Sequence, residues 1–289
     1  MFLGIIFAIL VAILWSIGEV SYSRLSRNLD RANVYLYQYL VRSIVYLTVV
    51  VIFNISLFTT FNLNHFLAFL PIILCDLFAS YVINIAVSNG KLSVVSPIMA
   101  AYPIIDIFLA MVLLKERMTI LELLLVIIIT ISIIVLANNQ KKTKNAPHPF
   151  KGIIFSLVYM FLIAFSTYFE KSIYIGDFSV YELYYYKGIV YFFTSMIFMA
   201  IIGFSPVKLK RLNLSILRGS IITPIGNVFN SFALSFTNMA IVSPISSMYS
   251  VLTAYISKKV LKEKLSLKES ICIFLILNCT ILLITIGLA

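Results

Sequence analysis

Three observations predict an all-α membrane protein with ten transmembrane helices arranged as two inverted five-helix repeats. Of the 289 residues, 62% are hydrophobic and only 11% are charged, whereas about 25% of residues are charged in a soluble domain. Apolar stretches of the length that a bilayer requires, about 20 residues, follow one another along nearly the whole chain. Short motifs also recur between the two halves of the sequence.

The composition excludes a soluble globular domain, a disordered chain and a disulfide-stabilised scaffold. The mean hydropathy is +1.06, which leaves too little polar surface for a soluble fold. The net charge of +11 fits basic cytoplasmic loops, and no soluble nucleic-acid-binding module accompanies it. Three cysteines and two histidines are too few for a metal site, and the cysteines are expected to be small buried hydrophobes. We therefore predict no metal, no cofactor and no nucleic-acid partner.

Polar breaks divide the chain into ten expected spans. The first has no basic region before it and is interpreted as a retained span, not a signal peptide. The longest basic connector lies mid-chain, which predicts repeat boundaries at 1–140 and 141–289. The spans are residues 2–22, 33–54, 66–88, 92–113, 119–137, 150–172, 179–202, 215–236, 240–259 and 267–288.

An internal duplication explains why the two halves carry the same motifs in the same order. The offsets are 145 to 148 residues, and a polar Lys-Glu-Arg/Lys match is hard to attribute to chance. Five spans is an odd number, so the second half enters the membrane from the opposite side. Such inverted repeats are typical of secondary transporters, whose binding site lies near the midplane. The matched segments are 4–7 with 152–155, 42–46 with 187–191, 95–98 with 242–245, and 114–119 with 261–266.

The distribution of basic residues predicts an orientation. Seventeen lie in the connectors after spans one, three, five, seven and nine, and three lie in the other connectors. The positive-inside rule then places the richer set in the cytoplasm and both termini outside.

With these motifs, the sequence resembles the drug/metabolite transporter superfamily and, within it, the EamA type. The matching features are the two five-span halves, the Ser-Pro-Ile elements at 96–98 and 243–245, and the Leu-Lys-Glu elements before spans five and ten. The resemblance covers residues 2–288. It implies a bacterial inner-membrane carrier for small metabolites, often an exporter, that works by alternating access. Many members are drawn with both termini in the cytoplasm, opposite to the charge-based orientation.

The first span places Trp15, Glu19 and Tyr22 on one helical face. An aromatic surface beside a carboxylate suits an organic cation, and Glu19 is also a candidate proton carrier. Its position is similar to the first-span glutamate of small multidrug resistance proteins. The alternative is that Glu19 lies at the interface and pairs with Arg24 or Arg27.

The second and seventh spans carry cations at matching positions, Arg42 beside Tyr39 and Lys187 beside Tyr184. In the functional interpretation these cations bind a substrate carboxylate or phosphate. In the alternative they neutralise buried acids, namely Asp76, Asp106 or Glu170.

Two further polar faces are candidate linings of a cavity. Asp76, Ser80 and Asn84 share a face of the third span, and Thr223, Asn227 and Asn230 share a face of the eighth. Hydrogen bonds between helices would explain the same spacing. Asp106 in the fourth span is the second proton-carrier candidate. For the prolines, we expect Pro97 and Pro244 to begin helices, and Pro103 and Pro224 to kink them.

These features together predict a secondary active transporter, an exporter or exchanger of small polar metabolites such as amino acids or amines, in a bacterial plasma membrane. A carrier of quaternary amines or drugs is the alternative. An intramembrane enzyme is disfavoured because no catalytic motif is present, and a scaffold is disfavoured by the costly charges within spans. Protons are a possible coupling ion, and lipid and a small-molecule substrate are the expected partners. The sequence leaves the oligomeric state and the direction of transport open.

Overall fold

The computed structural model describes residues 2–28, 31–54, 56, 58, 61–114, 147–175, 178–202, 214–237, 239–261 and 266–287, with shorter stretches between 120 and 135. Its described elements are helices, and none of the described residues forms a strand. The helices are α1 (Phe2–Asn28), α2 (Arg31–Phe53), α3 (Leu63–Asn89), α4 (Leu92–Met99), α5 (Pro103–Leu114), α7 (Pro149–Ile175), α8 (Val180–Ile202), α10 (Leu214–Phe236), α11 (Met239–Ser247), α12 (Tyr249–Val260) and α13 (Leu267–Gly287).

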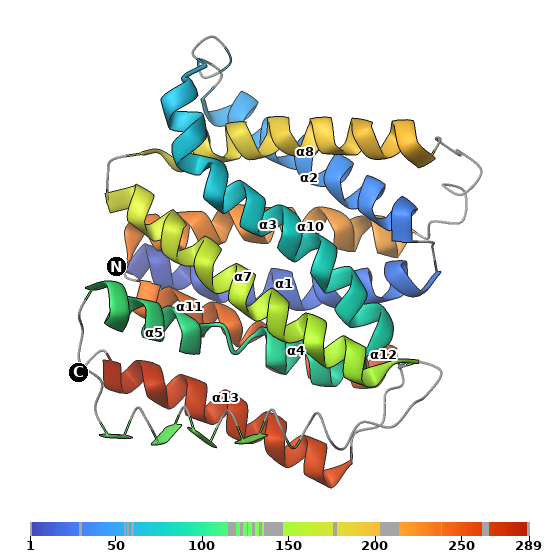
Figure 1. Cartoon of the computed structure of the whole chain (residues 1–289), viewed down its shortest axis with the longest axis vertical. Helices are drawn as coiled ribbons and strands as arrows, with labels where there is room; N and C mark the ends of the chain where they lie inside the picture. The colour runs from blue at the N-terminus through green and yellow to red at the C-terminus, as the bar shows by residue number, and fades with distance from the viewer. Residues whose placement is uncertain are drawn as a thin grey trace.

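The helices pair across the two halves of the chain. The most extensive packing joins α1 to α10, α3 to α7, and α2 to α8, and α2 and α8 lie together at one end of the bundle in Figure 1. Exchanging the halves converts the α1–α10 pair into the α7–α3 pair and leaves the α2–α8 pair in place. This is the packing expected of two repeats related by a twofold pseudosymmetry axis.

Four of the described helices are long and apolar enough to cross a membrane, which supports the predicted class. They span Phe2–Arg24, Val34–Phe53, Leu63–Asn89 and Pro149–Tyr174. The count of ten stays a prediction, because most of the expected fifth span, 119–137, lies outside the described residues. Ten of the twenty basic residues of the connectors also lie outside them, so the predicted orientation stays a prediction too.

The fourth and ninth spans, expected as single helices, are each divided into two. In the fourth, α4 ends at Met99 and α5 begins at Pro103, because a proline disfavours a helical conformation of the residue before it. In the ninth, the break is a single turn at Met248 between α11 and α12.

These breaks reverse two predictions about prolines. Pro97 lies inside α4, although it was expected to begin a helix, and Pro103 begins α5, although it was expected to kink one. Pro224 lies inside α10, and the kink expected there stays a prediction. The backbone of Pro244 lies within α11, so this residue does not begin a helix either.

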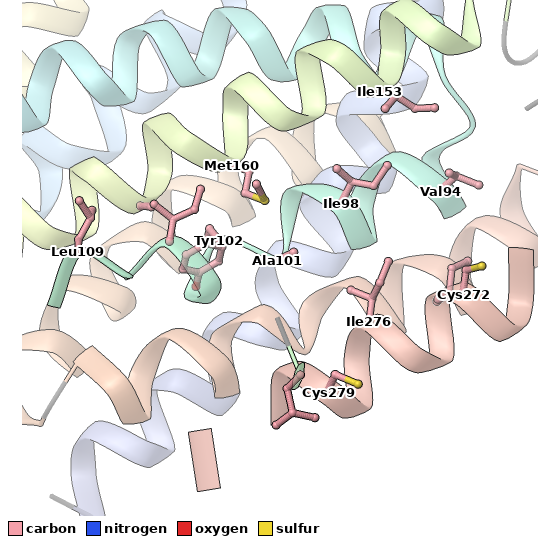
Figure 2. Close-up of a cluster of buried hydrophobic side chains, with 14 residues drawn as sticks. Val94, Ile98, Ala101, Tyr102, Leu109, Ile153, Met160, Cys272, Ile276 and Cys279 are labelled. Atoms are coloured by element: carbon pink, nitrogen blue, oxygen red, sulfur yellow. The ribbon is translucent and has the colours of Figure 1, made fainter. Parts of the chain in front are cut away.

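One hydrophobic cluster joins α4, α5 and α7 to α13 on the side of the bundle away from α2 and α8. Figure 2 shows Ala101 and Tyr102 of this cluster near Met160 of α7, with Val94 farther along α4. Cys272 and Cys279 lie on the α13 side, where both are buried and unoxidised, as small hydrophobic residues are. The cluster therefore packs the first broken span, α4–α5, against α7 and α13.

Candidate functional site

A polar cavity lies inside the bundle, lined by both halves of the chain. The space that water-sized molecules can occupy is about 70 Å³, well above the roughly 10–15 Å³ that one water needs. All the empty space between the lining side chains, including the part open to the outside, is about 750 Å³. The lining residues are Trp15, Glu19, Tyr22, Arg42, Asp76, Ala79, Ser80, Ile83, Tyr159, Ile163, Ser166, Thr167, Glu170, Tyr184, Lys187, Thr223, Asn227, Asn230, Ser231 and Tyr249.

One wall of the cavity is a chain of hydrogen bonds that connects α1, α10 and α2. Trp15 donates from Nε1 to Oδ1 of Asn227 at 2.9 Å, and Asn227 donates from Nδ2 to the hydroxyl of Tyr46 at 2.8 Å. The Trp15 ring also meets the edge of the Tyr249 ring, with centroids 5.6 Å apart. These contacts hold the indole against Tyr249 in a T-shaped pair, and both aromatic residues line the cavity.

Glu19 lies in the cavity, one turn beyond Trp15, and is 4% exposed. Ser96 of α4 donates a hydrogen bond to its Oε2, and the hydroxyls of Tyr249 and Thr253 face the same carboxyl. The other oxygen, Oε1, has no hydrogen-bond partner among the described residues. The alternative position of Glu19 at an interface does not fit this burial, because the helix turns the side chain toward α4 and α12, and Glu19 forms no ion pair with Arg24. The side chain of Arg27, the other partner considered, lies outside the described residues.

Lys187 is neutralised by two carboxylates. Its Nζ lies 2.6 Å from Oδ2 of Asp76 and 3.8 Å from Oε2 of Glu170, and the side chain is 2% exposed. Asp76 also accepts a hydrogen bond from Ser166 at 2.7 Å, and Glu170 accepts one from Tyr174 at 2.9 Å. For Lys187, the geometry thus favours the alternative in which the cation pairs with buried acids.

Arg42 has no such partners, although it is 6% exposed. It donates to the hydroxyl of Ser80 and, at 3.4 Å, to that of Tyr191. Its guanidinium carbon lies 5.9 Å from the ring centroid of Tyr22 and 5.8 Å from that of Tyr191. Among the described residues, no carboxylate oxygen lies within 4.0 Å of this guanidinium.

Eight of the ten predicted binding residues line the cavity, and two do not. Asn84 exchanges hydrogen bonds with Gln38, at 3.0 and 2.5 Å, so it connects α3 to α2 instead of facing the cavity. Tyr39 donates to the carbonyl of Leu77 at 3.4 Å and packs against other aromatic rings.

Asp106, the second proton-carrier candidate, also lies outside the cavity. It is 2% exposed, and neither carboxyl oxygen has a hydrogen-bond partner among the described residues, although Ser243 lies next to it. It does not pair with Arg42 or Lys187.

The sequence analysis did not single out several residues of the lining, notably Tyr159, Tyr249 and Ser231. Tyr184 and Ser231 share a hydrogen bond of 2.6 Å between their hydroxyls. For Tyr249 a signal existed, since it lies at the repeat offset from Tyr102 and both follow a Ser-Pro-Ile element. Tyr159 gave no signal, because 17 tyrosines and 23 phenylalanines are spread over the chain.

The comparisons with known proteins agree with this architecture. Twenty-eight chains of solved structures match the fold. One of them, titled "Crystal structure of protein", is 11% identical, covers 99% of this chain and 97% of its own, and has a TM-score of 0.67. No curated protein matches the chain. The profile of the EamA-like transporter family matches residues 2–138 and again residues 150–285, one match for each half. With its apolar spanning helices, the chain is a multi-pass membrane protein that belongs to the EamA-like transporter family.

Proposed function

We propose that the protein is a secondary active carrier that moves small polar metabolites, such as amino acids or amines, across a bacterial plasma membrane by alternating access. The observation that carries this proposal is the cavity between the two repeats, lined by charged, hydroxyl and aromatic side chains. In transporters built from such repeats, the substrate binds near the bilayer midplane beside interrupted helices. Here both interrupted spans reach the cavity region, through Ser96 of α4 and Tyr249 of α12.

Glu19 is the proposed coupling group. An unpaired carboxylate is costly to bury, so a proton or a cationic group of the substrate is expected to neutralise it. Its surroundings belong to both interrupted spans, since Ser96 of α4 donates to it and Thr253 of α12 faces the same carboxyl. Movement of either span relative to α1 would change the hydrogen bonds of the carboxyl, which is the requirement for coupling.

Transport in liposomes tests this proposal. The purified protein is reconstituted and loaded, and uptake of amino acids and amines is measured with and without an imposed pH gradient. Glu19→Gln is expected to abolish uptake driven by the gradient while the protein stays folded. Glu182→Gln is the matched control, because Glu182 pairs with His65 outside the cavity at 2.8 Å. Full activity of Glu19→Gln with an unchanged pH dependence would remove Glu19 as the coupling group.

The second candidate function is a carrier of organic cations. The observation in its favour is the aromatic surface of Trp15 and Tyr249 beside the Glu19 carboxyl. Rings of this kind attract quaternary ammonium groups. The same liposomes distinguish the two candidates, since a choline-like substrate that is transported in preference to amino acids would favour the second.

A further inference from the structure

The two membrane-buried cations of the cavity stand at equivalent positions in the repeats but have different surroundings. Lys187 has carboxylates on two sides, Asp76 from α3 and Glu170 from α7. Arg42 has only hydroxyls and aromatic faces, and its Nε has no hydrogen-bond partner among the described residues.

The repeat identifies the residues that stand at the Arg42 site in the positions of the two acids at the Lys187 site. At the offset of 147 residues, Asp76 corresponds to Thr223, and at the offset of 148, Glu170 corresponds to Tyr22. Both replacements line the cavity, and the Tyr22 ring lies next to the guanidinium of Arg42. The Arg42 site is therefore a copy of the Lys187 site in which both carboxylates have become neutral residues.

None of the acids of the lining pairs with Arg42. Glu19 accepts a hydrogen bond from Ser96 and, like the other two acids, has no carboxylate oxygen within 4.0 Å of the Arg42 guanidinium. Asp76 has one oxygen on Lys187 and one on Ser166, and Glu170 has one on Lys187 and one on Tyr174. A buried charge without a counter-charge is costly, and a cation–π contact offsets only part of that cost. An anion that enters the cavity would supply the missing partner.

We propose that Arg42 binds a carboxylate group of the substrate, so that the cargo of the carrier is a small carboxylate-bearing metabolite. This inference rests on the proposed function, and it narrows the substrate class. The guanidinium fork matches the two oxygens of a carboxylate. A phosphate dianion would require a second free cation, and Lys187 is already held by two acids. The hydroxyls of Ser80 and Tyr191 accept hydrogen bonds from Arg42, and the hydroxyl of Ser80 donates to the backbone carbonyl of Asp76.

Matched ligand pairs test this inference in a thermal-shift assay of the purified protein. Each pair differs only at the acid group: an amino acid with its amide, a hydroxy acid with its alcohol, and a sugar phosphate with its free sugar. A ligand that binds the folded state raises the melting temperature. Carboxylates are expected to raise it and their amides or alcohols are not, with the shift lost in Arg42→Gln and reduced in Arg42→Lys. Arg24→Gln, which removes an arginine outside the cavity lining, is the control.

Two variants separate a binding role from a structural one. Without ligand, Arg42→Gln is expected to melt at or above the wild-type temperature, because it removes an uncompensated charge. Thr223→Asp restores the carboxylate that the repeat has lost, so it is expected to stabilise the empty protein and to abolish the carboxylate shift. A lower melting temperature of Arg42→Gln with the ligand shift retained would overturn the inference.

The remaining outcomes are also decisive. If carboxylates shift wild type and Arg42→Gln equally, while Asn230→Ala loses the shift, the cavity binds substrate but the assignment to Arg42 fails. Binding of phosphates alone, or equal binding of amides and acids, overturns the carboxylate assignment. If no acid shifts the melting temperature and none is transported in liposomes, both this inference and the proposed function fail.

Discussion

Arg42 and Lys187 occupy the same place in the two halves, and only Lys187 is paired with carboxylates. The backbone around them is common to both halves, since α2 packs on α8 and the pairs α1–α10 and α7–α3 exchange with each other. The difference is confined to side chains such as Asp76 and Thr223. Duplication has thus kept the packing and left the charges free to diverge, so the two sites differ in the carboxylates that only one of them has and not in the cation that both share.

The largest expected effect concerns the paired cation. Asp76→Asn would leave Lys187 with only the longer contact to Glu170 at 3.8 Å. Removing one partner of a buried ion pair costs about 3–5 kcal/mol, so the melting temperature in detergent should fall clearly.

Glu170→Gln provides the comparison for that experiment. It removes the longer of the two contacts of Lys187, so its loss of stability should be smaller than that of Asp76→Asn. Equal melting temperatures for wild type and Asp76→Asn would show that Lys187 does not need its partner, and the contrast with Arg42 would then lose its basis.

An intermediate effect is expected at two equivalent glycines, Gly4 and Gly152. A Cβ at Gly152 would lie 2.7 Å from the backbone N and Cα of Gly90, in the turn between α3 and α4. A Cβ at Gly4 would lie 2.9 Å from Cβ of Thr237, the residue at the repeat offset from Gly90. Overpacking costs about 1–3 kcal/mol. Because backbone yields less readily than a side chain, Gly152→Ala should destabilise the protein more than Gly4→Ala.

Thermal melting of both alanine variants measures this difference. Thr237→Gly combined with Gly4→Ala is the control, since it removes the obstructing side chain and should restore stability. A lower melting temperature for Gly4→Ala than for Gly152→Ala would contradict this prediction. It would show that the contact of Gly152 with the backbone of Gly90 is not the tighter of the two.

Two features could be predicted from the sequence. They are the helices that recur in both halves and the cavity-lining residues that are spaced along one face of a helix. Trp15, Glu19 and Tyr22 were placed on one face by their spacing, and all three line the cavity. Helical spacing gives the face of a residue but not the neighbour that it meets. Asn84 shares a face with Asp76, yet it lies two turns farther along α3, where Gln38 of α2 is its partner.

The breaks in the fourth and ninth spans could not be located from the sequence. Pro97 and Pro103 lie six residues apart in the fourth span, and either could begin, interrupt or end a helix. In the structure α4 continues past Pro97 and ends two residues later. The ninth span has Ser250 at the position that corresponds to Pro103, so no proline marks its break at Met248.

The smallest expected effect compares the serines of the two Ser-Pro-Ile elements. Ser96 donates to Glu19, whereas the hydroxyl of Ser243 has no hydrogen-bond partner among the described residues. Interhelical hydrogen bonds of this kind contribute about 0.6–1.7 kcal/mol, so Ser96→Ala should lower the melting temperature modestly. Ser243→Ala should change it little, because the contact from Tyr102 at 3.0 Å uses the backbone carbonyl of Ser243, which alanine retains. Equal losses for the two variants would mean that the hydroxyl of Ser243 also has a partner, and that the first and second halves are alike at their helix breaks.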